Sequence, residues 1–121
     1  TSADALWNST SAGALWENHV ISQWQKWRDW HNPAASLWYW RDQGGNEVDL
    51  LIESDNRLTA IECKLAERPG GHDLRGLSRL EDFYGTEVIA HSFLACTTRQ
   101  PFNLTPRITA VSGWTTWPLT G

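Results

Sequence analysis

Two runs of mostly apolar residues between Glu47 and Lys64 flank a polar turn at residues 54–57. This pattern predicts two strands joined in a β-hairpin. Folding the segment about the middle of the turn places Asp49 opposite Glu62. The same register places Glu47 opposite Lys64. Because successive side chains of a strand point to opposite faces, the four charged residues are expected on one face. The other face is the expected core face, formed by Val48, Leu50, Ile52, Thr59, Ile61 and Cys63.

From about residue 13 to residue 30 the apolar residues recur with the period of a helix. One narrow stripe contains Trp16, Val20, Trp24 and Trp27. The pattern favours a helix that buries this stripe over one that stacks it on nucleic-acid bases. Glu17 lies at the rim of the stripe. Two interpretations of Glu17 stay open: a boundary carboxylate that reaches water, or a carboxylate carried by the helix towards the sheet.

The other predicted elements complete an α/β fold. The long apolar stretch near residue 90 is typical of an interior parallel strand that follows a helical crossover. We therefore expect a mixed central β-sheet, an antiparallel meander followed by a crossover helix and a further strand, flanked by helices. The expected elements are a strand over residues 37–41, a helix over 73–84, a strand over 87–95, a loop over 97–105 and a closing strand over 107–111.

The length of 121 residues indicates one domain. Residues 1–12 are small and polar and are expected to be a linker or a frayed terminus, so that the domain covers residues 13–121. The absence of methionine indicates a fragment of a larger product. No apolar run approaches the roughly 18 residues of a membrane span. Without such a span or a signal peptide, a cytoplasmic location is expected, and both cysteines, Cys63 and Cys96, are expected to be buried free thiols.

The formal net charge of −4 does not by itself indicate a nucleic-acid-binding protein, although local patches matter more than totals. Lys64 is one of only two lysines and lies in the hairpin. Arg41 is expected either in a surface ion pair or at a bound phosphate. Arg75 and Arg79 form a basic edge that is either solvated or in contact with phosphates.

The two opposed carboxylates of the hairpin, Asp49 and Glu62, carry the candidate chemistry. Directly opposed like charges on paired strands repel at Cβ separations of roughly 4.5–5.5 Å. A divalent cation between them reverses this effect, since Mg²⁺ and Mn²⁺ prefer carboxylate oxygens. The backbone carbonyl of Cys63 would complete the set, with the Cys63 side chain pointing into the core.

Two further charged residues would serve a reaction at such a metal site. Lys64 would orient an attacking water and neutralise charge that develops on a phosphate. Glu17 would anchor a second ion or an outer-shell water. The predicted catalytic residues are therefore Asp49, Glu62, Lys64 and Glu17, and the reaction class that needs them is phosphodiester hydrolysis.

The order of a helix Glu17, a strand Asp49 and the triplet Glu62-Cys63-Lys64 resembles the PD-(D/E)XK nuclease superfamily. Val48 stands where the name of the superfamily has proline. The segments GALWENHV, YWRDQGGNEVDLLIE, LTAIECKLAE and DLRGLSRL are similar to an uncharacterised domain at the C-terminus of many prokaryotic AAA ATPases. This resemblance covers about residues 13–90.

The resemblance implies a restriction-endonuclease-like core and a Mg²⁺- or Mn²⁺-dependent nuclease that cuts DNA. It also implies an N-terminal ATPase domain as a partner, because this chain has no P-loop of its own. The alternative is a catalytically silent regulatory module that binds DNA or protein for that ATPase. A third, purely structural interpretation keeps the fold, makes Glu47 and Lys64 a cross-strand salt bridge, and leaves the other acids solvated. Assembly into a homo-oligomer is left open.

Overall fold

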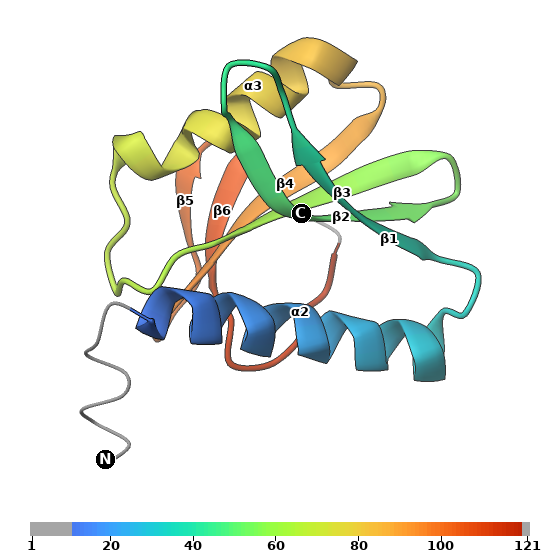
Figure 1. Ribbon diagram of the computed structural model, residues 1–121, viewed down its shortest axis with the longest axis horizontal. Coiled ribbons are helices and arrows are strands. Elements are labelled where there is room, and N and C mark those ends of the chain that lie inside the picture. The colour runs from blue at the N-terminus through green and yellow to red at the C-terminus, as the bar shows by residue number, and fades with distance from the viewer. Residues whose placement is uncertain (1–10, 120–121) are drawn as a thin grey trace.

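The computed structural model describes residues 11–119 and shows a six-stranded mixed sheet between two helical layers (Figure 1). The strand order is β1-β2-β3-β4-β6-β5. The elements are α2 (Ala12–His31), β1 (Ser36–Arg41), β2 (Glu47–Ser54), β3 (Arg57–Cys63), the 3₁₀ helix η1 (Gly71–Leu74), α3 (Arg75–Tyr84), β4 (Ile89–Cys96), β5 (Phe102–Thr105) and β6 (Ile108–Ser112).

The first three strands form the predicted antiparallel meander, and the chain then crosses over through η1 and α3. β4 returns parallel to β3, as predicted for an interior strand. β6 is parallel to β4, and β5 lies antiparallel at the edge. The mixed sheet flanked by helices is therefore confirmed.

The predicted hairpin register is also confirmed. β2 and β3 pair from Leu50 with Ile61 down to Ser54 with Arg57. Asp55 and Asn56 form the turn with φ angles of 53° and 62°. Such left-handed conformations are tolerated by Asp and Asn and match the twist of the flanking strands. Turn chemistry and cross-strand pairing thus agree on one register.

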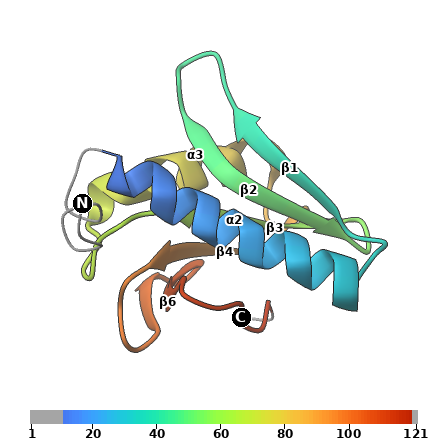
Figure 2. The ribbon, with the colours of Figure 1, turned by 60° about the horizontal axis from the view of Figure 1, so that its bottom comes forward.

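Both faces of the sheet are buried, which corrects the expectation of a single core face. Figure 2 shows α2 running along the strands with α3 behind them. The α2 layer includes the predicted tryptophan stripe and Trp117. The core on the α2 side contains Trp16, Val20, Trp24, Ala35, Leu50, Ile52, Ile61, Phe93, Ala95 and Val111. The core on the α3 side contains Val48, Leu51, Ala60, Leu74, Leu77, Leu80, Ile89, Leu94 and Ile108.

A β-bulge explains why Val48 packs in a different core from Leu50. The pairing of β1 with β2 shifts between Trp38, which faces Leu51, and Trp40, which faces Val48. Two residues of β2 therefore oppose one residue of β1, and such an insertion re-aims the side chains on either side of it. The strict alternation expected from the sequence fails at this point.

Two element boundaries differ from the predictions. Helix α2 begins at Ala12, which is 2% exposed, so the expected linker ends before it. The linker prediction for residues 1–10 lies outside the described residues. The expected loop over residues 97–105 contains the short strand β5, which gains its order from pairing with β6. Among residues 11–119, neither long helix is apolar enough to cross a bilayer.

A glycine lets α3 approach the sheet. A Cβ on Gly76 would lie 2.0 Å from the carbonyl oxygen of Glu47 and 3.3 Å from Oε2 of Glu62. Backbone cannot move away as a flexible side chain does, so a side chain here would displace the first turn of α3. Gly76 therefore permits the contact between α3 and the end of β2.

We expect Gly76→Ala to lower the free energy of unfolding by on the order of 3 kcal/mol, because the new methyl group overpacks this contact. Gly13→Ala is the matched control, since nothing lies within 4 Å of its Cβ position and it occupies a helix. That control should gain about 0.5–1 kcal/mol from helix propensity. Urea unfolding of both variants checks the prediction, and equal stability of the two would contradict it.

Candidate functional site

The backbone ladder between β2 and β3 ends at Leu50 and Ile61, although both strands continue. Beyond this pair β2 stays bonded to β1 as far as Glu47. β3 stays bonded to β4 as far as Cys63. The two central strands therefore separate at this end. The backbone N–H groups of Asp49 and Cys63, which face the gap, have no partner in the opposite strand's backbone ladder.

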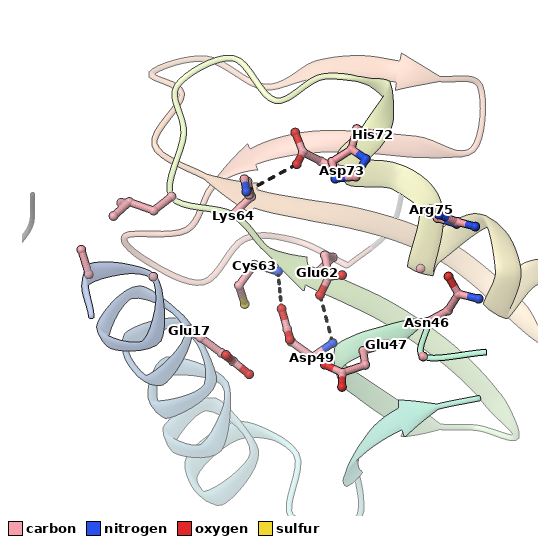
Figure 3. Close-up of a pocket in the computed structure, with 15 residues that line it drawn as sticks. Glu17, Asn46, Glu47, Asp49, Glu62, Cys63, Lys64, His72, Asp73 and Arg75 are labelled. Carbon is pink, nitrogen blue, oxygen red and sulfur yellow. Dashed lines mark hydrogen bonds and ion pairs between the residues drawn. The ribbon is translucent and has the colours of Figure 1, made fainter. Parts of the chain in front are cut away.

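Two carboxylates fill the opening between the separated strands. The backbone N–H of Cys63 donates to Oδ2 of Asp49 at 2.8 Å. The backbone N–H of Asp49 donates to Oε1 of Glu62 at 3.2 Å (Figure 3). The predicted opposition of Asp49 and Glu62 is confirmed, with each carboxyl bound to the backbone of the facing strand. The carboxyl groups are thus fixed in place by hydrogen bonds that the fold requires.

A pocket of about 630 Å³ opens over this end of the sheet. It brings together the four predicted catalytic residues: Glu17 from α2, Asp49 from β2, and Glu62 and Lys64 from and just after β3. Figure 3 shows the Glu17 side chain directed from the helix towards Asp49. The second interpretation of Glu17, a carboxylate carried towards the sheet, is therefore confirmed.

Two of the three central acids, Glu17 and Glu62, have raised pKa values. Burial, followed by hydrogen bonding to the Asp49 carboxyl and repulsion from it, raises the pKa of Glu62 from 4.5 to about 10. Burial, followed by repulsion from Asp49, raises the pKa of Glu17 from 4.5 to about 7. Hydrogen bonds from backbone N–H groups partly oppose this rise in the pKa of Glu62. Without a bound cation, protonation of Glu62 and Glu17 reduces the repulsion among these acids.

Cys63 contacts both the core and the pocket. Its side chain packs against the α2-side core, as predicted, but the residue also lines the pocket. Burial raises the pKa of the Cys63 thiol, and the negative charges of Asp49, Glu62 and Glu17 raise it further. The thiol therefore lies at the boundary between core and acidic cluster. Both cysteines are free, as predicted, with Cys96 buried and Cys63 half-buried.

The cations of the site have different partners from those expected. Nζ of Lys64 lies 3.6 Å from Oδ1 of Asp73. Arg41 forms its ion pair with Glu47, which confirms the surface pair favoured for it. The salt bridge between Glu47 and Lys64 that the purely structural interpretation required is therefore wrong, because the strands separate before they reach this pair.

Three polar residues of the crossover also line the pocket, His72, Asp73 and Arg75, together with Gly76. Of these, Arg75 was predicted as part of a possible phosphate contact, whereas its neighbour Arg79 does not line the pocket. The sequence indicated Asp73 only as the first residue of the predicted helix over 73–84. It instead accepts a hydrogen bond from the Gly70 N–H and pairs with Lys64. No sequence signal indicated that pairing, because it depends on how the loop folds back.

The donor groups of the pocket suit a hard cation. The carboxyl groups of Asp49 and Glu62 each accept a backbone hydrogen bond from the facing strand and lie against each other. Carboxylate and carbonyl oxygens are the ligands that Mg²⁺ and Mn²⁺ prefer. Within residues 11–119, no group of three or more His, Cys, Asp or Glu side chains is arranged as a ready-made metal site. A cation here would therefore need carbonyl and water ligands beside the two carboxylates.

We expect the metal-free protein to lose stability as the pH rises from 5 to 8. The raised pKa values mean that the folded state holds protons that the unfolded state, with pKa values near 4.5, releases. This stabilisation is complete below pH 4.5, and its loss becomes full as the pH passes about 7 for Glu17 and about 10 for Glu62. Each such proton contributes a slope of at most about 1.4 kcal/mol per pH unit.

Urea unfolding in EDTA at several pH values measures this slope. Glu62→Gln should flatten it, whereas the exposed Glu87→Gln should leave it unchanged. An unchanged slope in Glu62→Gln would show that Glu62 binds no extra proton in the folded state.

Comparison with curated proteins and with solved structures gave no match. A family model described as "Domain of unknown function (DUF4143)" matches residues 12–117, which is most of the chain. This confirms the resemblance to an uncharacterised ATPase-associated domain, while membership of the nuclease superfamily stays a prediction. The chain belongs to the DUF4143 family, a domain found in AAA ATPase-associated proteins.

Proposed function

We propose that this domain is a metal-dependent nuclease that hydrolyses DNA phosphodiester bonds as part of an AAA-type ATPase. The observation that carries the proposal is the convergence of Asp49 and Glu62 between separated strands, with Glu17 and Lys64 in the same pocket. The order of helix, three-strand meander, crossover helix and parallel strand supports a restriction-endonuclease-like core. The acid pair supplies the ligands that such a reaction needs.

The metal, Mg²⁺ or Mn²⁺, would be held by the carboxylates of Asp49 and Glu62 and the backbone carbonyl of Cys63. When bound, it would supply Lewis-acid stabilisation of charge on the phosphate and favour ionisation of a water. Glu17 would anchor a second ion or an outer-shell water. The α2 helix holds Glu17 in position because its neighbour Trp16 is fully buried and donates from Nε1 to the Ala95 carbonyl at 3.0 Å.

Lys64 would act on the attacking water and on the phosphate. Its side chain is 51% exposed, directly follows β3, and lines the pocket beside Glu62. An ammonium group in this place donates hydrogen bonds to a water nucleophile and offsets negative charge that develops in the transition state. Its ion pair with Asp73 would orient the ammonium group while leaving other N–H donors for water and phosphate.

A second candidate is a catalytically silent module that binds DNA or protein and regulates the attached ATPase. Two observations favour it. Lys64 is already paired with Asp73, and the pocket carries an excess of acids over bases. Such a module would use the acid cluster as a structural joint between β2 and β3, with protons in place of a metal.

Manganese should raise the melting temperature by several degrees at pH 7.5 if the acids bind it, since a ligand of the folded state stabilises that state. Asp49→Asn should abolish the gain, because asparagine keeps an oxygen acceptor for Cys63 but removes the charge. Asp55→Asn is the matched control, at the opposite end of the same hairpin in a turn that asparagine tolerates. Differential scanning fluorimetry with and without Mn²⁺ checks the prediction. An equal gain in all three proteins would place the metal elsewhere.

Nicking of supercoiled plasmid in Mn²⁺ tests the reaction itself. Lys64→Ala should slow nicking about 100-fold or more, as expected for loss of a transition-state contact. Lys26→Ala removes the other lysine of the chain, which is exposed on α2, and should not change the nicking rate. A wild type that binds DNA tightly and yet never nicks it would favour the regulatory module. Full activity of Lys64→Ala would remove Lys64 from the mechanism.

A further inference from the structure

The candidate site by itself repels a nucleic acid. Two cations, Lys64 and Arg75, face an excess of carboxyl groups in the pocket. When all five carboxyl groups are ionised, the formal charges of the pocket still sum to a negative value with a divalent ion bound. Affinity for nucleic acid, by contrast, comes mainly from cations that contact phosphates. A strand that reaches the site therefore needs cationic contacts nearby. The carboxyl groups are those of Glu17, Glu47, Asp49, Glu62 and Asp73.

A second cavity, of about 450 Å³, lies beyond the same ends of β3 and β4. It is formed by the loop after β3, residues 67–69, and the segment after β4, residues 98–102. The two segments stay in register because Lys64 N–H donates to Ala95 and Thr97 N–H donates to Ala66. Four residues of chain reach at most about 13 Å, which bounds the separation of Lys64 and Arg68. At about 3.4 Å per nucleotide along one strand, this upper bound corresponds to no more than about four stacked nucleotides.

The cavity has the chemistry of a nucleotide site. Arg68 and Arg99 are exposed and, among residues 11–119, neither forms an ion pair with a carboxylate. Glu67 is the single acid in the lining, so the cations are in excess. Phe102 is 38% exposed at the rim and offers an aromatic face. Arginines for phosphate and an aromatic ring for a base are the elements of single-strand recognition.

Both walls of this cavity are conformationally restricted. Pro69 is buried and restricts the backbone of its loop. On the other wall the Thr98 hydroxyl, 8% exposed, donates to the Gln100 carbonyl at 2.8 Å. A site with restricted walls loses less conformational freedom on binding than a mobile loop.

We propose that this cavity, the Arg68–Arg99 cavity, binds an unpaired nucleotide within about four positions of the phosphate that is cut. The inference rests on the proposed nuclease function and narrows its substrate to nucleic acid with a single-stranded segment. A base can stack on Phe102 only when its face is exposed, and an intact duplex covers that face with neighbouring bases. The arginines hold the phosphate of the same nucleotide.

The test measures binding without cleavage. Asp49→Asn serves as the parent protein, in EDTA, with fluorescein-labelled (dT)8 and a labelled 12-base-pair blunt duplex as probes in fluorescence anisotropy. In this background, Arg68→Ala, Arg99→Ala and Phe102→Ala should each weaken (dT)8 binding about five- to tenfold or more. Phe102→Ala should leave duplex binding unchanged. Glu67→Gln should tighten (dT)8 binding, because it removes a negative charge that repels the phosphates.

Matched controls lie elsewhere on the surface. Arg57→Ala removes an exposed arginine at the far end of β3. Phe83→Ala removes a phenylalanine that is 71% exposed on α3. Neither should change (dT)8 affinity, and circular dichroism should show all variants folded.

Three results would overturn the assignment: no (dT)8 binding by the parent, unchanged (dT)8 affinity in the arginine variants, or loss of affinity only for duplex. Unchanged (dT)8 affinity in Phe102→Ala would overturn the stacked base. Plasmid nicking by the wild type is scored separately. Weakened (dT)8 binding without any nicking would keep the cavity assignment and reject the nuclease.

Discussion

The exchange of hydrogen bonds between two carboxyl groups and two backbone amides, where β2 and β3 separate, is the interaction on which this structure depends. Buried backbone N–H groups without a partner are costly, and the separated strands would leave two of them. The carboxyls of Asp49 and Glu62 accept these bonds. The same contact brings two acids together in a half-buried place, where only a proton or a cation makes them tolerable. Stability and candidate chemistry therefore arise from one arrangement.

The helices bring further charged residues to this arrangement. The buried tryptophans of α2 fix Glu17 at the edge of the sheet, and Gly76 lets α3 reach the Glu47 carbonyl, so that Arg75 lines the same pocket. An excess of acids so close together attracts cations and repels phosphate. A nuclease built in this way would need its substrate contacts outside the acid cluster. The proposal assigns those contacts to the two arginines of the Arg68–Arg99 cavity.

Where prediction from sequence failed, a non-local contact was responsible. Strand β5 has only four residues and forms because β6 offers an edge. The bulge opposite β1 moves Val48 into the α3-side core, which strict alternation could not anticipate. The alternative salt bridge between Glu47 and Lys64 required the hairpin ladder to continue, but the strands diverge towards their outer neighbours.

The sequence by itself determined the hairpin register and the buried face of the first helix. Both depend on residues close together in the chain: turn formers at Asp55 and Asn56, and apolar side chains one helical turn apart. Only the tertiary structure decided that Glu17 faces the acid pair, that Lys64 contacts Asp73, and that the Cys63 thiol borders the acids. Those outcomes depend on how separate elements pack, and local periodicity carries no information about that packing.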